Sequence, residues 1–159
     1  MPGLEDLYRE IILDHYRSPR NRGELPVPPA TRTEGFNPLC GDEIVVFVSL
    51  DGEVVSDIRI AGQGCSISQS SASMMSAAVK GRTLAEVADL TTAFKSMMSI
   101  HESTLDGGTG PDVVEAPEGV KLGDLEALQG VVKFPVRIKC ATLSWNTLAQ
   151  AITEAAARA

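Results

Sequence analysis

Residues 44–60 carry the pattern of apolar and polar positions that a pair of β-strands requires. Residues 44–50 are a β-branched and aromatic run, Asp51 and Gly52 follow, and residues 54–60 form a second run. Asp-Gly between two such runs is a strong hairpin signal. In the second run, positions 54, 56, 58 and 60 alternate with 55, 57 and 59, so one face of this strand is expected to be solvated.

Helical spacing of apolar residues predicts a first helix that ends before Pro19. Apolar positions recur three and four residues apart over residues 4–15. The pair Ser18-Pro19 stops this helix, because proline donates no backbone hydrogen bond and restricts the residue before it. Five prolines within residues 19–39 exclude regular helix there and predict an extended path to Cys40.

Further helices are expected after the hairpin. One follows Cys65 and ends at Gly81, a candidate C-cap. Thr83 and Glu86 have the spacing of a capping box and start the next helix, which runs to about residue 99. A short helix is expected around residues 124–129. The last helix carries an apolar stripe at spacings of three and four: Ile138, Ala141, Trp145, Leu148 and Ile152.

The order of these elements favours an α+β fold in one domain. Strands come before most of the helices, which is typical of an antiparallel sheet rather than of parallel βαβ units. A chain of 159 residues fits a single domain spanning residues 1–159. Residues 101–121, rich in glycine, proline and acids, are expected to form a long loop or inserted segment.

Composition and charge exclude several classes of partner. The net charge of −7 argues against nucleic acid, whose binding depends on Lys and Arg, and 4% aromatic residues provide no stacking platform. No apolar stretch approaches the ~20 residues that cross a bilayer, so no membrane association is expected. The N-terminus lacks the basic start of a secretory signal, which predicts a cytoplasmic location. Three cysteines in such a location argue against a disulfide framework.

The three cysteines are the candidate reactive groups, and each lies at a junction. Cys40 precedes a strand, Cys65 precedes a helix, and Cys140 opens the last helix. A helix N-terminus favours the thiolate form, so Cys65 and Cys140 are expected to be better ligands or nucleophiles than core thiols. Gly41 allows Asp42 to turn its carboxylate towards the same centre as the Cys40 sulfur.

The spacing of the cysteines leaves their chemistry open. A lone cysteine is often a small buried apolar residue. Three thiolates and a carboxylate suit tetrahedral zinc, and the same thiolates would also suit an iron–sulfur cluster. The chain has no CxxC pair, which makes a thiol–disulfide oxidoreductase the weakest candidate.

Four stretches of the chain resemble the IscU/NifU-type iron–sulfur assembly proteins in order and register: LYREIILDHYRSPRNRG, NPLCGDE, GQGCSISQSSASMM and FPVRIKCATLSW. The resemblance covers nearly the whole chain. It is greatest to the SufU branch, because Lys139 stands where IscU-like scaffolds have histidine and because residues 101–121 match an added segment of that branch. The resemblance implies a SufE/NifU/IscU-like fold, with a small three-stranded antiparallel sheet packed against several helices.

The same resemblance implies a site and a function. Cys40, Asp42, Cys65 and Cys140 would coordinate one zinc ion. Cys40 would accept sulfane sulfur from the persulfide of a SufS-like cysteine desulfurase and pass it to downstream Suf cluster-assembly proteins, as a sulfurtransferase. Arg137 matches an arginine of the SufU pattern and is expected to support Asp42 or a developing thiolate.

Two alternatives to the zinc-dependent sulfurtransferase are kept. By resemblance to IscU, the chain would be a scaffold that assembles a transient [2Fe–2S] cluster, or binds iron, on the corresponding ligands. In the other alternative the metal is purely structural and the chain is an interaction module. The two histidines are expected to have no part in the site: His15 as a packing residue with satisfied polar atoms, and His101 as a surface residue.

Overall fold

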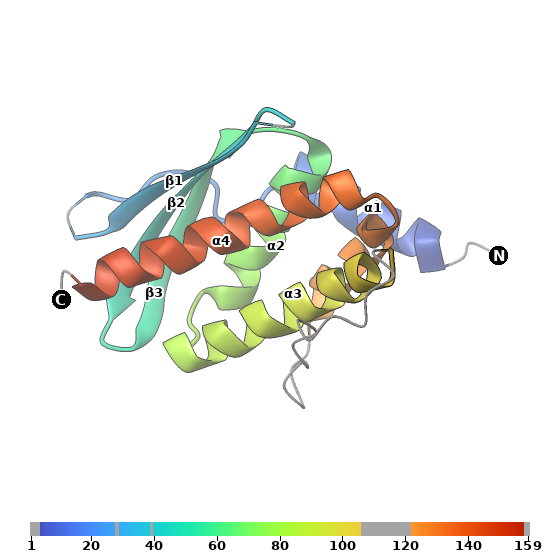
Figure 1. Cartoon of the computed structure of the whole chain (residues 1–159). Coiled ribbons are helices and arrows are strands. Elements are labelled where there is room, and N and C mark those ends of the chain that lie inside the picture. The colour runs from blue at the N-terminus through green and yellow to red at the C-terminus, as the bar shows by residue number, and fades with distance from the viewer. Residues whose placement is uncertain (1–3, 28, 39, 106–121, 158–159) are drawn as a thin grey trace.

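The computed structural model describes residues 4–27, 29–38, 40–105 and 122–157, which contain three strands and five helices (Figure 1). In chain order these are α1 (Leu4–Arg17), β1 (Thr31–Asn37), β2 (Asp42–Asp51), β3 (Val54–Gln63), α2 (Ser66–Val79), α3 (Leu84–Leu105), the 3₁₀ helix η1 (Gly123–Lys133) and α4 (Pro135–Ala157). Within the described ranges, no helix combines the length and the apolar character that crossing a bilayer requires.

The strands form one antiparallel sheet in the order β1-β2-β3, with β2 in the centre. The long helix α4 lies across this sheet and packs on β1 and β2 (Figure 1). Helix α2 packs against both α1 and α4. The expected α+β fold with a three-stranded antiparallel sheet is therefore confirmed.

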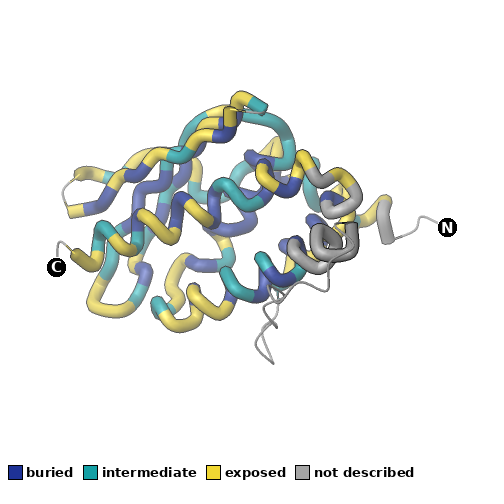
Figure 2. The backbone as a smooth tube through the Cα atoms, viewed as in Figure 1, coloured by how far each residue is buried: buried dark blue, intermediate teal, exposed yellow. Residues whose placement is uncertain are grey.

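The core lies between the sheet and the helices that cover it, where the buried stretches of β2, β3, α2 and α4 face one another (Figure 2). Val46 and Ile58 of the sheet are fully buried, as is Trp145 in the apolar stripe of α4. The Trp145 ring stacks on Phe94 of α3, with ring centroids 5.0 Å apart. Burying a side chain of this size stabilises the fold by roughly 1.5–3 kcal/mol, so this cluster holds α3 and α4 together.

The hairpin is confirmed, but a bulge in β3 changes which side chains face the core. Near the turn the register shifts, so that Leu50 pairs with Val55 and Ser56 is the extra residue of the bulge. Val55 is fully buried, whereas Val54 is only half-buried. The predicted alternation placed Val54 on the same face as Ile58. This is wrong between the turn and the bulge, because one inserted residue reverses which face each side chain occupies.

Two helix ends carry the caps that the sequence predicts. Gly81 follows α2 with a φ of +82°, the left-handed conformation that glycine adopts after a helix. At the start of α3 the backbone N–H of Glu86 donates to Thr83 Oγ1, and the N–H of Thr83 donates to Glu86 Oε1, both at 3.1 Å. The capping box is therefore confirmed.

Helix α3 is longer than the apolar pattern predicted. It runs to Leu105, so residues 101–105 of the expected loop are helical. Residues 101–105 contain neither glycine nor proline, so nothing in this stretch breaks the helix. The remainder of the expected insert, residues 106–121, and the side chain of His101 lie outside the described residues.

His15 is a packing residue with satisfied polar atoms, as predicted. Its side chain is 3% exposed and lies between α1, α2 and η1. Nδ1 lies 2.8 Å from Ser73 Oγ, and Nε2 lies 2.9 Å from Asp124 Oδ2. The His15 ring therefore links three helices by polar contacts.

The close crossing of β1 and α4 depends on Gly35. A Cβ atom at this position would overlap Thr147 Oγ1 on α4 and would lie 3.0 Å from Ile44 Cγ2. Only glycine leaves room for the helix at this distance. Because β1 leads to Cys40 and α4 carries Cys140, the crossing sets how these two sulfurs meet.

We expect Gly35→Ala to lower the free energy of unfolding by about 2 kcal/mol, because overpacking a tight contact costs this much. Urea unfolding followed by circular dichroism measures the change. Adding Thr147→Ala should restore part of the loss, because it removes the overlapping oxygen. Gly130→Ala is the matched control, since a Cβ atom there meets nothing within 4 Å. An unchanged unfolding midpoint for Gly35→Ala would contradict this account.

Candidate metal centre

Two cysteines and one aspartate meet where β1, β2 and α4 come together. Cys40 lies in the loop between β1 and β2, Asp42 is the first residue of β2, and Cys140 lies on α4. One ligand atom from each lies within 4.8 Å of the other two. Cys140 Sγ donates a hydrogen bond to Cys40 Sγ across 3.2 Å. Asp42 and Cys140 are fully buried, and Cys40 is half-buried.

Asp42 is a buried carboxylate that hydrogen bonds keep ionised. The backbone N–H of Cys65 donates to its Oδ1 at 2.9 Å, and Asn37 Nδ2 donates to its Oδ2 at 3.3 Å. Burial alone would raise the pKa of Asp42. The hydrogen bonds from the Cys65 backbone, from the Cys140 and Cys65 thiols and from Asn37 outweigh that effect and hold the pKa below its usual value. Asp42 is thus a charged potential metal ligand at neutral pH.

Cys65 borders this group from the start of α2. It is the N-cap of that helix, and its sulfur accepts from the backbone N–H of Ser68 at 3.5 Å. Its thiol also interacts with Asp42 and Cys140. Its sulfur is nevertheless outside the set of atoms that lie within 4.8 Å of one another. The predicted ligands are therefore adjacent, with three in close contact and Cys65 beside them.

Cys140 was expected to open the last helix, but its surroundings are not those of a helix N-terminus. Helix α4 begins at Pro135, a favoured first helical residue, so Cys140 lies in the second turn with its backbone N–H bonded inside the helix. Burial, together with hydrogen bonds to Asp42 and to Cys40, raises the pKa of its thiol. The expectation that the helix start favours its thiolate is therefore wrong. A bound metal ion would be needed to remove its proton at neutral pH.

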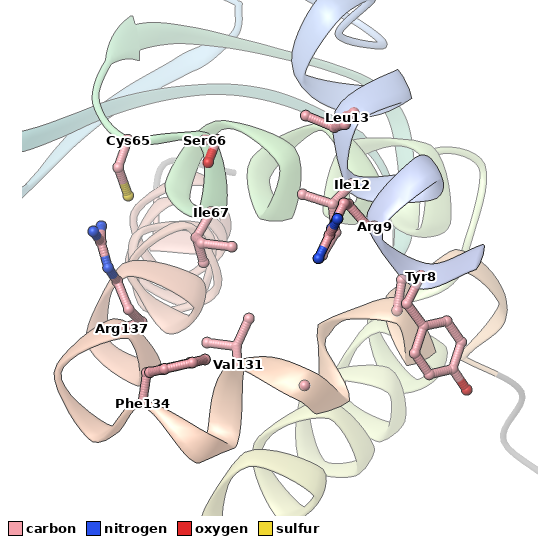
Figure 3. Close-up of a pocket in the computed structure, with 12 residues that line it drawn as sticks. Tyr8, Arg9, Ile12, Leu13, Cys65, Ser66, Ile67, Val131, Phe134 and Arg137 are labelled. Atoms are coloured by element: carbon pink, nitrogen blue, oxygen red, sulfur yellow. The ribbon is translucent and has the colours of Figure 1, made fainter. Parts of the chain in front are cut away.

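Arg137 lies against the cysteines rather than against Asp42. The pKa of its guanidinium is raised chiefly by charge interaction with Cys65 and by a hydrogen bond to it, and then by the charges of Cys140 and Cys40. Figure 3 shows the Arg137 side chain directed from α4 towards the Cys65 sulfur. Of the two roles that the sequence suggested for Arg137, the geometry favours support of a thiolate. Lys139 is exposed and takes no described part in the site.

Sequence reasoning missed two residues that shape the site. Asn37 Nδ2 contacts both Asp42 and the Cys140 sulfur, at 3.3 and 3.5 Å. Gly64 makes room for the carboxylate, because a Cβ atom there would lie 2.5 Å from Asp42 Oδ1. The asparagine that opens the NPLCGDE stretch, three residues before Cys40, was a usable signal for the first. Nothing in the sequence shows which backbone approaches Asp42.

The donor atoms fit a zinc ion. Two thiol sulfurs and one ionised carboxylate are in close contact, and these are ligand types that tetrahedral zinc accepts; the Cys65 sulfur lies beside them as a candidate fourth ligand. Two thiolates on one tetrahedral zinc ion lie about 3.8 Å apart. The 3.2 Å between the Cys40 and Cys140 sulfurs is near this value, and Cys40, in a half-buried loop, is the side that can adjust.

The comparisons with known proteins agree on one family. A family model described as NifU-like N terminal domain matches residues 7–141. Over 151 residues the chain is 45% identical to the zinc-dependent sulfurtransferase SufU of Bacillus subtilis (strain 168), covering 95% of this chain and 92% of that protein.

Two solved structures are similar in fold. The first, from Fervidobacterium islandicum AW-1, is described as an iron–sulfur cluster assembly scaffold protein for the SUF system. It superposes with a TM-score of 0.71 at 29% identity, covering 92% of this chain and 97% of that one. The second is a nitrogen-fixing NifU-like protein (N-terminal) from Brucella abortus, with a TM-score of 0.77 over 98% and 99% of the two chains. At 24% identity, this second likeness shows the fold alone.

We expect Asn37→Ala to weaken zinc binding by roughly tenfold to a hundredfold, because it removes a donor that orients two ligands. Competition with a chromophoric chelator measures the affinity. Asn146→Ala serves as a control, since Asn146 is an exposed amide on α4 that bonds to Lys95. Equal zinc affinity of Asn37→Ala and the unaltered chain would show that Asn37 does not orient the ligands.

Proposed function

The chain belongs to the NifU-like N-terminal domain family, and we propose that it acts in iron–sulfur cluster assembly as a zinc-dependent sulfurtransferase. In this proposal Cys40 takes sulfane sulfur from a SufS-like cysteine desulfurase and passes it to downstream Suf proteins. The chain works as a single cytoplasmic domain with an inserted segment at 101–121. The observation that carries the proposal is the contact of Cys40, Asp42 and Cys140, with Cys65 alongside, in a relative of SufU.

Cys40 is the best placed of the three thiols to receive sulfur. It is half-buried in a loop, whereas Cys140 is fully buried and out of reach of a partner's persulfide. Cys65 is also half-buried, but Arg137 lies against its sulfur. Access is one of the factors that govern the rate at which a sulfur attacks, and it favours Cys40.

The transfer of sulfur to Cys40 needs no added oxidant or reductant. The Cys40 thiolate attacks the outer sulfur of the desulfurase persulfide and forms a new S–S bond. The bond between the two persulfide sulfurs breaks, and the desulfurase cysteine leaves as a thiolate. A second exchange of the same kind, with an acceptor thiol as the nucleophile, returns Cys40 to its starting state.

Cys40, Asp42, Cys65 and Cys140 would hold the zinc ion. When bound, zinc keeps its cysteine ligands deprotonated without redox chemistry of its own. Asp42 contributes a charge that its hydrogen bonds already stabilise. The Arg137 guanidinium lies beside the Cys65 sulfur, so it would balance the negative charge of this ligand while Cys40 is engaged with a partner.

A scaffold that builds a [2Fe–2S] cluster is the second candidate. The same cysteines and Asp42 would hold the cluster as cargo, and the Fervidobacterium structure is described as that of an iron–sulfur cluster assembly scaffold protein for the SUF system. Lys139 in place of the histidine of IscU-like scaffolds favours the sulfurtransferase, because the cluster would lose a ligand. If the protein turns brown, with visible absorption, on anaerobic incubation with iron and sulfide, the scaffold is supported. A protein that stays colourless with one zinc per chain supports the sulfurtransferase.

We expect Cys40→Ala to lose essentially all sulfur acceptance from a SufS-like desulfurase, because the attacking sulfur is absent. Intact-mass spectrometry detects the added sulfur on the unaltered chain. Lys139→Ala is the control, since this exposed neighbour of Cys140 should load normally. The role of Cys40 is refuted if Cys40→Ala, with its fold checked by circular dichroism, gains sulfur at the same rate as the unaltered chain. A purely structural metal predicts that result.

A further inference from the structure

A cavity of about 720 Å³ opens beside the candidate metal centre (Figure 3). Residues of α1, the start of α2, η1 and the start of α4 line it, and Cys65 marks its boundary with the metal centre. Its volume is in the range of sites that hold small molecules. The sulfur-transfer proposal assigns no occupant to this space.

The lining of the cavity is cationic in a strongly acidic chain. Arg9 and Arg137 line it from α1 and α4, and none of its described lining residues is acidic (Figure 3). The whole chain carries 21 Asp and Glu residues and a net charge of −7. Among the ion pairs of the described residues, none includes Arg9 or Arg137. Two guanidinium groups without carboxylate partners favour a ligand that brings negative charge.

Apolar side chains line the space between the two arginines. The wall includes Ile12, Ile67, Val131 and Phe134, and residue Phe134 is 62% exposed. In Figure 3 Arg137 lies beside Cys65, on one side of the cavity, and Arg9 enters from α1 on the other. An apolar middle with a cationic group at each side matches a molecule with a hydrocarbon centre and two anionic ends.

We propose that this cavity binds a small aliphatic dicarboxylate, with one carboxylate on Arg9 and the other on Arg137. Arginine binds carboxylates with paired, charge-assisted hydrogen bonds, which are the strong ones. Ser66, in the first turn of α2, adds a hydroxyl donor to the wall. The proposal concerns ligand binding alone and does not rest on the sulfurtransferase function.

The ligand and the metal centre share Arg137. This guanidinium interacts with the Cys65 sulfur, and a carboxylate in the cavity competes for the same group. Binding of a dicarboxylate therefore changes the charge environment of Cys65. Such coupling is reciprocal. If the ligand changes the affinity for the metal ion by some factor, the metal ion changes the affinity for the ligand by the same factor.

Calorimetric titration of the zinc-loaded chain with succinate, glutarate, adipate and suberate tests the proposal, and adipamide serves as the uncharged control. We expect saturable one-to-one binding of at least one dicarboxylate, no binding of adipamide, and shifted NMR methyl signals of Ile67 and Val131. Arg9→Gln and Arg137→Gln should each weaken binding about tenfold or more, because each removes a charge-assisted contact. Lys139→Gln, which removes an exposed charge outside the cavity, should leave the affinity unchanged.

Three results would overturn the proposal. The first is absence of binding by the whole series at millimolar concentration. The second is binding that both arginine variants retain at full strength. The third is a shift of the Ile67 and Val131 signals by an acidic peptide alone, which would assign the cavity to a protein partner. No desulfurase is present in these titrations, so they test ligand binding alone. The mass-spectrometric assay of Cys40→Ala tests sulfur transfer, and the two experiments can fail independently.

Discussion

The buried carboxylate of Asp42 is the interaction on which the rest of this structure depends. An ionised group that is shielded from water is stable only when hydrogen bonds replace the water. Here the donors come from Asn37 at the end of β1 and from the backbone N–H of Cys65 at the start of α2. One side chain at the start of β2 therefore joins three elements, and the described residues that keep it charged are neutral hydrogen-bond donors.

The arrangement around Asp42 gives the three thiols different environments. Cys140 is sealed in the core and holds its proton, whereas the Cys65 sulfur lies beside a guanidinium. Cys40 is half-buried in a loop where Gly41 has a φ of +67°, a conformation that other residues adopt with strain. A metal ion held by all three sulfurs would thus be anchored on its buried side and released most easily at Cys40.

Local signals in the sequence predicted local structure well. The capping box of Thr83 and the packing role of His15 follow from neighbouring residues and are confirmed. The bulge at Ser56 reversed one predicted face, because the register is set by the partner strand. The grouping of the three cysteines and Asp42 came from a family resemblance, since distances across the fold cannot be read from spacing. The raised pKa of Cys140 and the contact of Arg137 with Cys65 arise only from packing.

We propose that Cys40, Asp42, Cys65 and Cys140 bind one zinc ion together, with Cys65 joining the three ligands already in contact. Zinc K-edge X-ray absorption of the zinc-loaded chain tests it most directly. We expect three sulfur neighbours at about 2.3 Å and one oxygen at about 2.0–2.2 Å. A shell of two sulfurs with two lighter ligands would place Cys65 outside the site and refute the four-ligand zinc site.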